Sequence, residues 1–204
     1  MNATKAIPKY EKRIVKHLEN SNGIITARSC REQGIPTIYL TRLTEKGVLR
    51  RMAPGIYGTE SADFDELFFF QYRFSKSVFS YETAASLLGV SDKIINRMDV
   101  TVSEKYNFGN RLPNINIHYV KKEWLNLGVT SRKTVFGNPV RVYSYERTLC
   151  DVILNRDKVD PETYVKLIRG YSSYMERNLK ELQEIANKMG VLQKVTDIME
   201  IAYE

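Results

Sequence analysis

Hydrophobic residues near the start of the chain recur at helical spacing. Tyr10, Ile14 and Leu18 are separated by four-residue steps, so they share one face of a helix. Asn22-Gly23 follows and is typical of a helix end, since both residues tolerate the left-handed backbone of a C-cap. The pattern predicts an amphipathic helix that begins after Pro8.

A second, shorter helix is predicted immediately afterwards. Thr26 is a good N-cap, and the helix is expected to run to about Gln33, where Gly34 stops it. Ala27 and Cys30 take its inward positions. We interpret Cys30 as a small core residue and not as a reactive thiol.

A third helix is expected in IPTIYLTRLTEKG, capped by Thr37, with Leu40 and Leu43 inward. LRRMAPGIYG, residues 49–58, then reads as two short strands joined by a type II turn at Pro54-Gly55. Three helices followed by a hairpin are the order of a winged helix-turn-helix, in which the third helix enters the major groove of DNA.

The rest of the chain predicts a different kind of domain. RMDVTVS and NINIHYV alternate like strands, and a hairpin is expected through Gly137-Asn138-Pro139. From Ser144 onward the pattern is helical, with caps at Ser144 and at Asp160-Pro161. The expected fold class is α+β, an N-terminal winged helix-turn-helix followed by a mixed α/β domain with a helical C-terminal part. We divide the chain into a DNA-binding domain (1–58), a hinge (59–63) and a body (64–204).

Charge separates the same two parts of the chain. Residues 1–58 hold 11 lysines and arginines against 4 acidic residues, whereas residues 59–204 hold 20 of each sign, so the net charge of +7 lies entirely in the first part. A basic segment followed by a neutral body is typical of a nucleic-acid-binding module joined to another function.

Candidate DNA contacts follow from the third helix and the hairpin. Arg42 can bond both acceptors of one guanine, and threonine can bond phosphate or touch a thymine methyl group. Arg50 and Arg51 point to opposite faces of their strand, so one can reach phosphate while the other braces the wing or enters the groove. Tyr39 can contact DNA or close the core. The predicted DNA-binding residues are Thr37, Tyr39, Thr41, Arg42, Lys46, Arg50 and Arg51.

Signs of catalysis or of a cofactor are weak, and we predict neither. GxGxxG, GxxxxGK[ST], HExxH and GxSxG motifs are absent. Asp99 precedes Glu104-Lys105 near a strand, but the spacing is not that of a metal nuclease. His118 alternates with apolar neighbours and is expected to be structural. Cys30 and Cys150 suggest no disulfide framework, and the few cysteines and histidines have no zinc spacing.

A membrane segment is not expected either. The longest apolar-aromatic run, LFFFQYRF at 67–74, is too short to span a bilayer, and no apolar stretch follows the charged first residues as in a signal peptide. We therefore expect a cytoplasmic protein without membrane contacts.

Several stretches resemble the AbiEi antitoxin family of type IV toxin–antitoxin phage-defence systems. They are GIITARSCREQGIPTIYLTRLTEKGVLRRMAPGIYG, FSYETAASLLGVSD, VTVSEK and VRVYSYERTLCDVI. The resemblance implies an N-terminal module that represses its own operon through inverted repeats and a body that counters a co-encoded nucleotidyltransferase toxin. It transfers no residue-level motif for antitoxicity, and it leaves open whether the toxin is bound, modified or opposed indirectly.

The expected partners are thus operator DNA with inverted repeats and the toxin. We expect a monomer away from DNA, with two copies pairing on the operator. One alternative is a ligand-sensing winged-helix repressor without a toxin, which a small-molecule site in the body would favour. Another is an enzyme directed to DNA, such as a nuclease.

Overall fold

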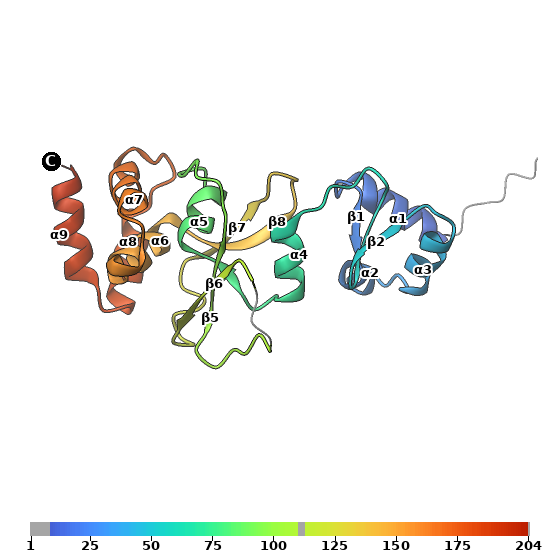
Figure 1. Cartoon of the computed structure of the whole chain (residues 1–204), viewed down its shortest axis with the longest axis horizontal. Helices are drawn as coiled ribbons and strands as arrows, with labels where there is room; N and C mark the ends of the chain where they lie inside the picture. The colour runs from blue at the N-terminus through green and yellow to red at the C-terminus, as the bar shows by residue number, and fades with distance from the viewer. Residues whose placement is uncertain (1–8, 110–112, 204) are drawn as a thin grey trace, which may run out of the picture. The chain divides into compact units, whose positions relative to one another are not determined.

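The computed structural model describes residues 9–109 and 113–203 (Figure 1). The chain forms two compact units. The first comprises Met1–Phe70 and Thr134–Asn138, and the second comprises Gln71–Lys133 and Pro139–Glu204. Among the described residues, every helix is too short or too polar to cross a bilayer.

The first unit is a winged helix, which confirms the predicted fold class. In chain order its elements are α1 (Lys9–Glu19), β1 (Ile24–Thr26), α2 (Ala27–Glu32), α3 (Ile38–Glu45), β2 (Arg50–Ala53) and β3 (Ile56–Gly58), followed by the start of α4 (Glu66–Arg73). Its strands form one antiparallel sheet in the order β1-β3-β2.

The core of the winged helix includes the residues predicted from helical spacing, together with Ile25, Ile35 and Leu49, which were not predicted. Ile14 and Leu18 of α1 pack against Leu40 and Leu43 of α3, and the Cys30 side chain is fully buried among them. Each of these side chains removes apolar surface from water, and together they hold the three helices in one arrangement. Burial also raises the pKa of the Cys30 thiol, which fits a core residue and not a nucleophile.

Local backbone signals have the predicted effect at most helix ends. Thr26 caps α2, since its hydroxyl accepts a hydrogen bond from the amide of Ser29 at 3.0 Å, and Ser29 completes a capping box. Asn22 and Gly23 both have positive φ, as the predicted end of α1 requires. Gly55 has a φ of 79°, which a type II turn needs at its third position.

Two local predictions were wrong or incomplete. Thr37 makes no capping hydrogen bond, because it already has helical dihedrals and α3 begins instead with a tight turn in which the Pro36 carbonyl accepts from the amide of Tyr39. Strand β1 was not predicted. Its three residues are too few to show a periodicity, and the strand exists because β3 supplies its hydrogen-bond partners.

The second unit combines a mixed sheet with helices, as predicted. Its strands have the order β6-β5-β4-β8-β7, with parallel pairs β5–β6 and β4–β8 and antiparallel pairs β4–β5 and β7–β8. Its elements after α4 are β4 (Val78–Phe79), α5 (Tyr81–Leu87), β5 (Met98–Ser103), β6 (Ile115–Val120), β7 (Val129–Lys133), β8 (Pro139–Tyr143), α6 (Tyr145–Leu154), the 3-10 helix η1 (Arg156–Lys158), α7 (Pro161–Ser173), α8 (Leu179–Lys188) and α9 (Leu192–Tyr203).

Helix α6 is the centre of the second unit's helical part, where α7, α8 and α9 gather around it (Figure 1). Leu149, Val152 and Ile153 are fully buried there. The predicted caps at Ser144 and Asp160 are also confirmed, since their side chains accept hydrogen bonds from the amides of Arg147 and Thr163. Leu182, Ile185 and Ala186 of α8 are buried, whereas Leu179 is 52% exposed.

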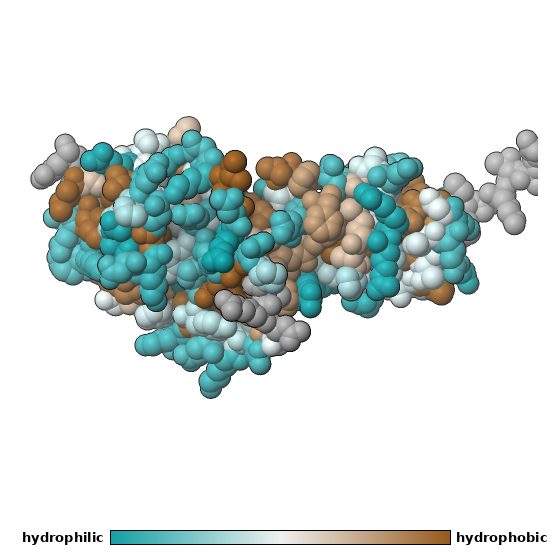
Figure 2. All heavy atoms as spheres, in the orientation of Figure 1, coloured by the Kyte–Doolittle hydropathy of each residue, from teal (hydrophilic) through white to brown (hydrophobic). Residues whose placement is uncertain are grey.

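Leu179 lies beside an apolar groove of about 490 Å³ between α8 and α9. Hydrophobic surface over α9 interrupts the hydrophilic surface in Figure 2. Leu192 and Met199 line the same groove, so the two C-terminal helices leave part of their apolar faces uncovered.

Gly128 is required where the chain turns into β7. Its φ is 67°, and a Cβ built there would stand 2.6 Å from the Cβ of Arg147 and 2.9 Å from the Cδ1 of Ile185. Any larger residue would therefore suffer both a left-handed backbone and a clash with side chains of α6 and α8.

Candidate functional site

The exposed face of α3 presents most of the residues predicted to contact DNA. Thr37, Thr41 and Arg42 are exposed, while Leu40 and Leu43 hold the opposite face of the helix in the core. Thr37 is available at the start of the helix because its hydroxyl does not cap it. In a winged helix this face is the one that enters the major groove.

Tyr39 is half-buried and closes the core beside this face. Its ring lies 5.2 Å from the ring of Tyr10 on α1, and it packs against the cluster around Leu40. The Arg42 guanidinium lies over the same ring, with its central carbon 5.3 Å from the ring centroid. Tyr39 thus helps to orient Arg42 through a cation–π contact.

Lys46, at the end of α3, forms an ion pair within the winged helix. Its Nζ lies 2.7 Å from Oε1 of Glu11 on α1, and the Glu11 side chain is largely buried. The pair ties the last turn of α3 to α1. Because Glu11 offsets the charge of Lys46, a phosphate would meet a weaker positive charge here than the sequence suggests.

The adjacent Arg50 and Arg51 of β2 differ in their surroundings. Arg50 donates hydrogen bonds to the carbonyl oxygens of Thr59 at 3.3 Å and Ala62 at 2.7 Å. Arg51 is exposed, and it forms no ion pair in the described part of the chain. Alternating side chains on a strand point to opposite faces, so Arg50 braces the segment after the wing while Arg51 faces solvent.

Two exposed apolar residues beside these cations were missed from the sequence. Ile38 in the first turn of α3 is 51% exposed, and Val48 before β2 is 45% exposed. Ile38 begins α3, and Val48 lies three residues after its last residue. The helical spacing already indicates that Ile38 is exposed, because Ile38 does not fall on the inward face with Leu40 and Leu43.

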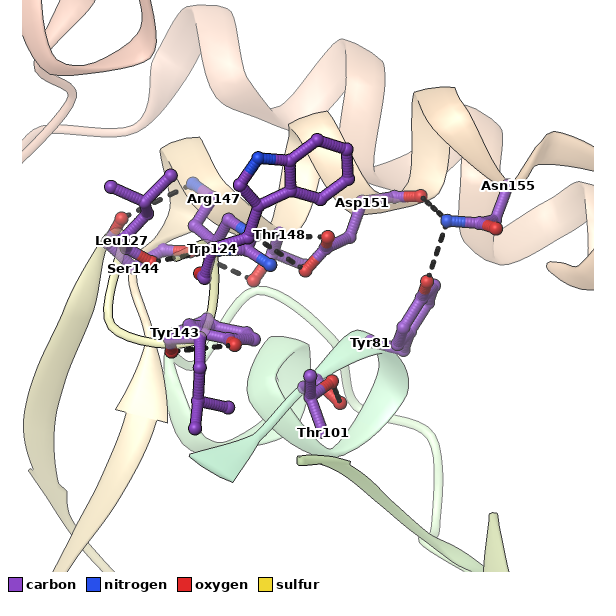
Figure 3. Close-up of polar contacts among 12 residues, drawn as sticks. Tyr81, Thr101, Trp124, Leu127, Tyr143, Ser144, Arg147, Thr148, Asp151 and Asn155 are labelled. Carbon is purple, nitrogen blue, oxygen red and sulfur yellow. Dashed lines mark hydrogen bonds and ion pairs between the residues drawn. The ribbon is translucent and has the colours of Figure 1, made fainter. Parts of the chain in front are cut away.

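The second unit contains a buried polar network centred on α6 (Figure 3). Arg147 is fully buried, and its Nε donates to both carboxylate oxygens of Asp151 at 3.1 Å. Its Nη1 donates to the carbonyl of Leu127, and its guanidinium stacks on the ring of Tyr143. Burial raises the pKa of the Asp151 carboxyl, and the charge of Arg147 opposes that shift.

The network continues from α6 to α5. The side-chain amide of Asn155 donates to the Asp151 carbonyl at 3.1 Å and to the hydroxyl of Tyr81 at 3.0 Å (Figure 3). Tyr81 has a φ of 46°, an uncommon backbone conformation for a large side chain. Burial raises the pKa of its hydroxyl well above the usual range. The neighbouring helices therefore hold Tyr81 in a strained position.

Tyr81 also contacts the histidine that the sequence marked as structural. The His118 ring stacks on Tyr81 with centroids 4.0 Å apart, and its Nε2 lies 2.8 Å from Oδ1 of Asp99. Asn116 donates to the same oxygen at 3.2 Å. Both Asp99 and His118 line a large polar cavity, together with Glu104. Lys105 is not among its lining residues.

Metal ligands are not gathered at either place. Within residues 9–109 and 113–203, no three His, Cys, Asp or Glu side chains come together in a way that could hold a metal ion. The residues around Asp99 can hold and orient a small ligand by hydrogen bonds. The residues on α3 and β2 instead present cations and hydroxyls on an exposed face, where they can contact a macromolecule.

Comparison with protein-family models gives a match to the first part of the chain. Residues 12–59 match the model of a family described as "Transcriptional regulator, AbiEi antitoxin". No curated protein matches the chain. The matched residues include α3 and both strands of the wing, so they contain all seven predicted DNA contacts. Residues 12–59 of this chain are thus similar to the AbiEi antitoxin family of transcriptional regulators, in agreement with the resemblance found in the sequence.

Proposed function

We propose that this protein is an autoregulating antitoxin of a type IV toxin–antitoxin phage-defence system. Its winged helix, residues 1–58, binds inverted repeats in the promoter of its own operon. The body, residues 64–204, counters a co-encoded toxin of the nucleotidyltransferase class. The observation that carries the DNA-binding part is the exposed surface formed by α3 and β2, inside the segment that matches the family of regulators.

The charges on this surface support DNA as the partner. Arg42 projects from the exposed face of α3, and Arg51 projects from the wing without an ion pair in the described part of the chain. In the proposed complex Arg42 reaches the major groove and Arg51 reaches the neighbouring phosphates. Thr37 and Thr41 add hydroxyls for phosphate or thymine contacts, and Arg50 supports the wing from behind.

Binding by one winged helix is expected to be weak and dependent on salt. If one copy neutralises about five phosphates, the slope of log affinity against log salt is about −4.5, which is a loss of about 500-fold between about 50 and 200 mM salt. Two copies on an inverted repeat provide useful affinity, because each occupies one half-site.

A gel-shift titration with the promoter fragment of the protein's own operon tests this assignment. We expect Arg42→Ala and Arg51→Ala each to weaken binding by at least about tenfold. Lys180→Ala, at an exposed lysine of α8, is the matched control and should leave binding unchanged. Equal affinity of all four proteins would refute the assignment of α3 and the wing.

A ligand-sensing repressor without a toxin is the second candidate function. The polar cavity that contains Asp99 and His118 is the observation in its favour. The neighbouring gene distinguishes the two candidates. A harmless product of that gene would favour the ligand-sensing repressor, and a toxic nucleotidyltransferase that this chain neutralises would favour the antitoxin.

A further inference from the structure

The polar cavity in the second unit has a volume of about 1210 Å³, which is large enough for a small organic ligand. Segments from several elements form its wall, including β5, β6, α6 and η1. Polar groups make up most of that wall, in contrast to the apolar groove between α8 and α9. An adjoining hollow of about 600 Å³ shares Arg97 and Lys158 with it.

On one side of the cavity, hydrogen bonds and ring stacking hold the polar side chains in place. Asp99 is buried, and its carboxylate already holds His118 and Asn116 in place. Tyr81 stacks on His118 in a strained backbone conformation, and Asn155 anchors the Tyr81 hydroxyl. Strained residues persist where the surrounding structure holds them, and they cluster at ligand sites. These contacts fix the orientation of the imidazole and the amide before any ligand arrives.

The charges around the cavity select the sign of a ligand. Arg97 precedes β5, Lys121 follows β6, and Lys158 lies in η1, so the three cations come from separate segments. None of them forms an ion pair with a carboxylate in the part of the chain that the structure describes. Two of the lining carboxylates are already engaged, Asp99 with His118 and Asp151 with Arg147. Among the described residues that line the cavity, Glu104 is the remaining acid, so cations predominate among the groups left for a ligand.

We propose that the polar cavity binds a small molecule that carries phosphate groups. Arg97 and Lys158 line both the cavity and the adjoining hollow, and a phosphate chain offers this pair more charge and more acceptor oxygens than a lone carboxylate does. The amides of Asn114 and Asn116 add neutral donors in the same wall. This binding site lies in the body, and it does not depend on the proposed operator binding or on the toxin.

The protein carries a built-in reporter of this site. Trp124 is the only tryptophan of the chain, it lines the cavity, and Lys121 lies over its ring at 5.0 Å. A ligand that occupies the cavity changes the surroundings of the indole. We therefore expect inorganic pyrophosphate, added to the full chain, to produce a saturable change in tryptophan fluorescence and a matching heat in calorimetry.

The test uses two double variants with the same change of charge. Arg97→Gln with Lys158→Gln should weaken pyrophosphate binding at least tenfold. Lys180→Gln with Lys194→Gln, at exposed lysines of α8 and α9, should change it less than twofold. Arg42→Ala with Arg51→Ala should also leave it unchanged, which separates this site from the basic winged helix. Citrate should bind at least tenfold more weakly than pyrophosphate.

Three results would overturn the proposal. The first is the absence of both a heat and a fluorescence change at about 10 mM pyrophosphate, a concentration that would reveal even very weak binding. The second is an equal loss of pyrophosphate affinity in the two glutamine double variants. The third is citrate binding as tightly as pyrophosphate. Thermal unfolding of each variant confirms that the cavity residues are tested in a folded chain. Growth rescue from the toxin is a separate measurement, so the failure of this proposal and the failure of the antitoxin assignment are distinguishable.

Discussion

The guanidinium of Arg50 donates a hydrogen bond to the carbonyl oxygen of Ala62 at 2.7 Å, across the segment that follows the wing. Ala62 is buried, and the amide of Thr59 donates to the Gly23 carbonyl at 2.9 Å. Residues 59–63 form no helix or strand, yet these bonds fasten them to the winged helix. The two neighbouring arginines therefore have different tasks.

We expect Arg51→Ala mainly to weaken DNA binding and Arg50→Ala mainly to weaken the local structure after the wing. Arg51→Ala should weaken DNA binding and reduce the salt slope by about one, because one phosphate contact is lost. Arg50→Ala should instead lower the free energy of local unfolding of residues 59–63 by about 1 kcal/mol, because the hydrogen bonds of Arg50 are lost. Gel shifts at several salt concentrations, together with hydrogen exchange at the Thr59 amide, measure the two effects. A larger loss of DNA affinity in Arg50→Ala than in Arg51→Ala would contradict this division.

Glu11→Gln should strengthen DNA binding. The substitution removes the carboxylate that pairs with Lys46, so the full charge of Lys46 becomes available to a phosphate. Affinity for promoter DNA should rise several-fold, and the salt slope should steepen by up to about one. Glu19→Gln on the same helix is the control, since Glu19 is exposed and forms no ion pair in the described residues. Equal gains in both variants would show that only net charge matters.

Gly128→Ala should destabilise the second unit strongly. The added Cβ combines a left-handed backbone with close approach to Arg147 and Ile185, for a cost of about 3 kcal/mol. Gly89→Ala has a similar φ of 72° but meets nothing within 4 Å, so about 1 kcal/mol is expected there. Urea unfolding of both variants measures the difference. Equal losses would mean that the contact with α6 is unimportant.

The Asp160 cap should make the stability of the second unit depend on pH in the acid range. The ion pair with Lys93, followed by hydrogen bonds from Thr163, lowers the pKa of Asp160 from 3.8 to about 2. A folded-state pKa below the unfolded value means that the contribution is complete above about pH 4 and is lost as the pH falls toward 2.

Asp160→Asn isolates this effect, because asparagine still caps a helix but cannot pair with Lys93. The stability difference between the natural chain and the variant should shrink as the pH falls from about 4 to about 2. Thermal unfolding at a series of pH values measures it. A difference that stays constant over this range would contradict the assignment.

The sequence predicts those parts of the fold that depend on neighbouring residues. The inward faces of α1 and α3 follow from spacing, and the cap at Thr26 follows from residue type. Strand β1 could not be predicted, because its pairing depends on β3, about 30 residues later. Thr37 was misjudged because Pro36 starts a tight turn that makes a side-chain cap unnecessary.

The candidate sites were likewise predictable only where they depend on residues that are close in sequence. The exposed cations of α3 follow from the positions that face away from Leu40 and Leu43. The task of Arg50 was left open, since it depends on a carbonyl oxygen 12 residues away. The polar cavity could not be predicted from the sequence. Arg97, His118 and Lys158 are distant in sequence, and only the fold of the second unit makes them line the same cavity.

We propose that one chain both neutralises a toxin and represses its own promoter. The most direct test expresses the neighbouring gene's product from an independent promoter, beside a reporter driven by this protein's own promoter. The natural chain should restore growth and silence the reporter, and Arg42→Ala with Arg51→Ala should restore growth but leave the reporter active. Failure of the natural chain to restore growth, or full repression by the double variant, would contradict the account.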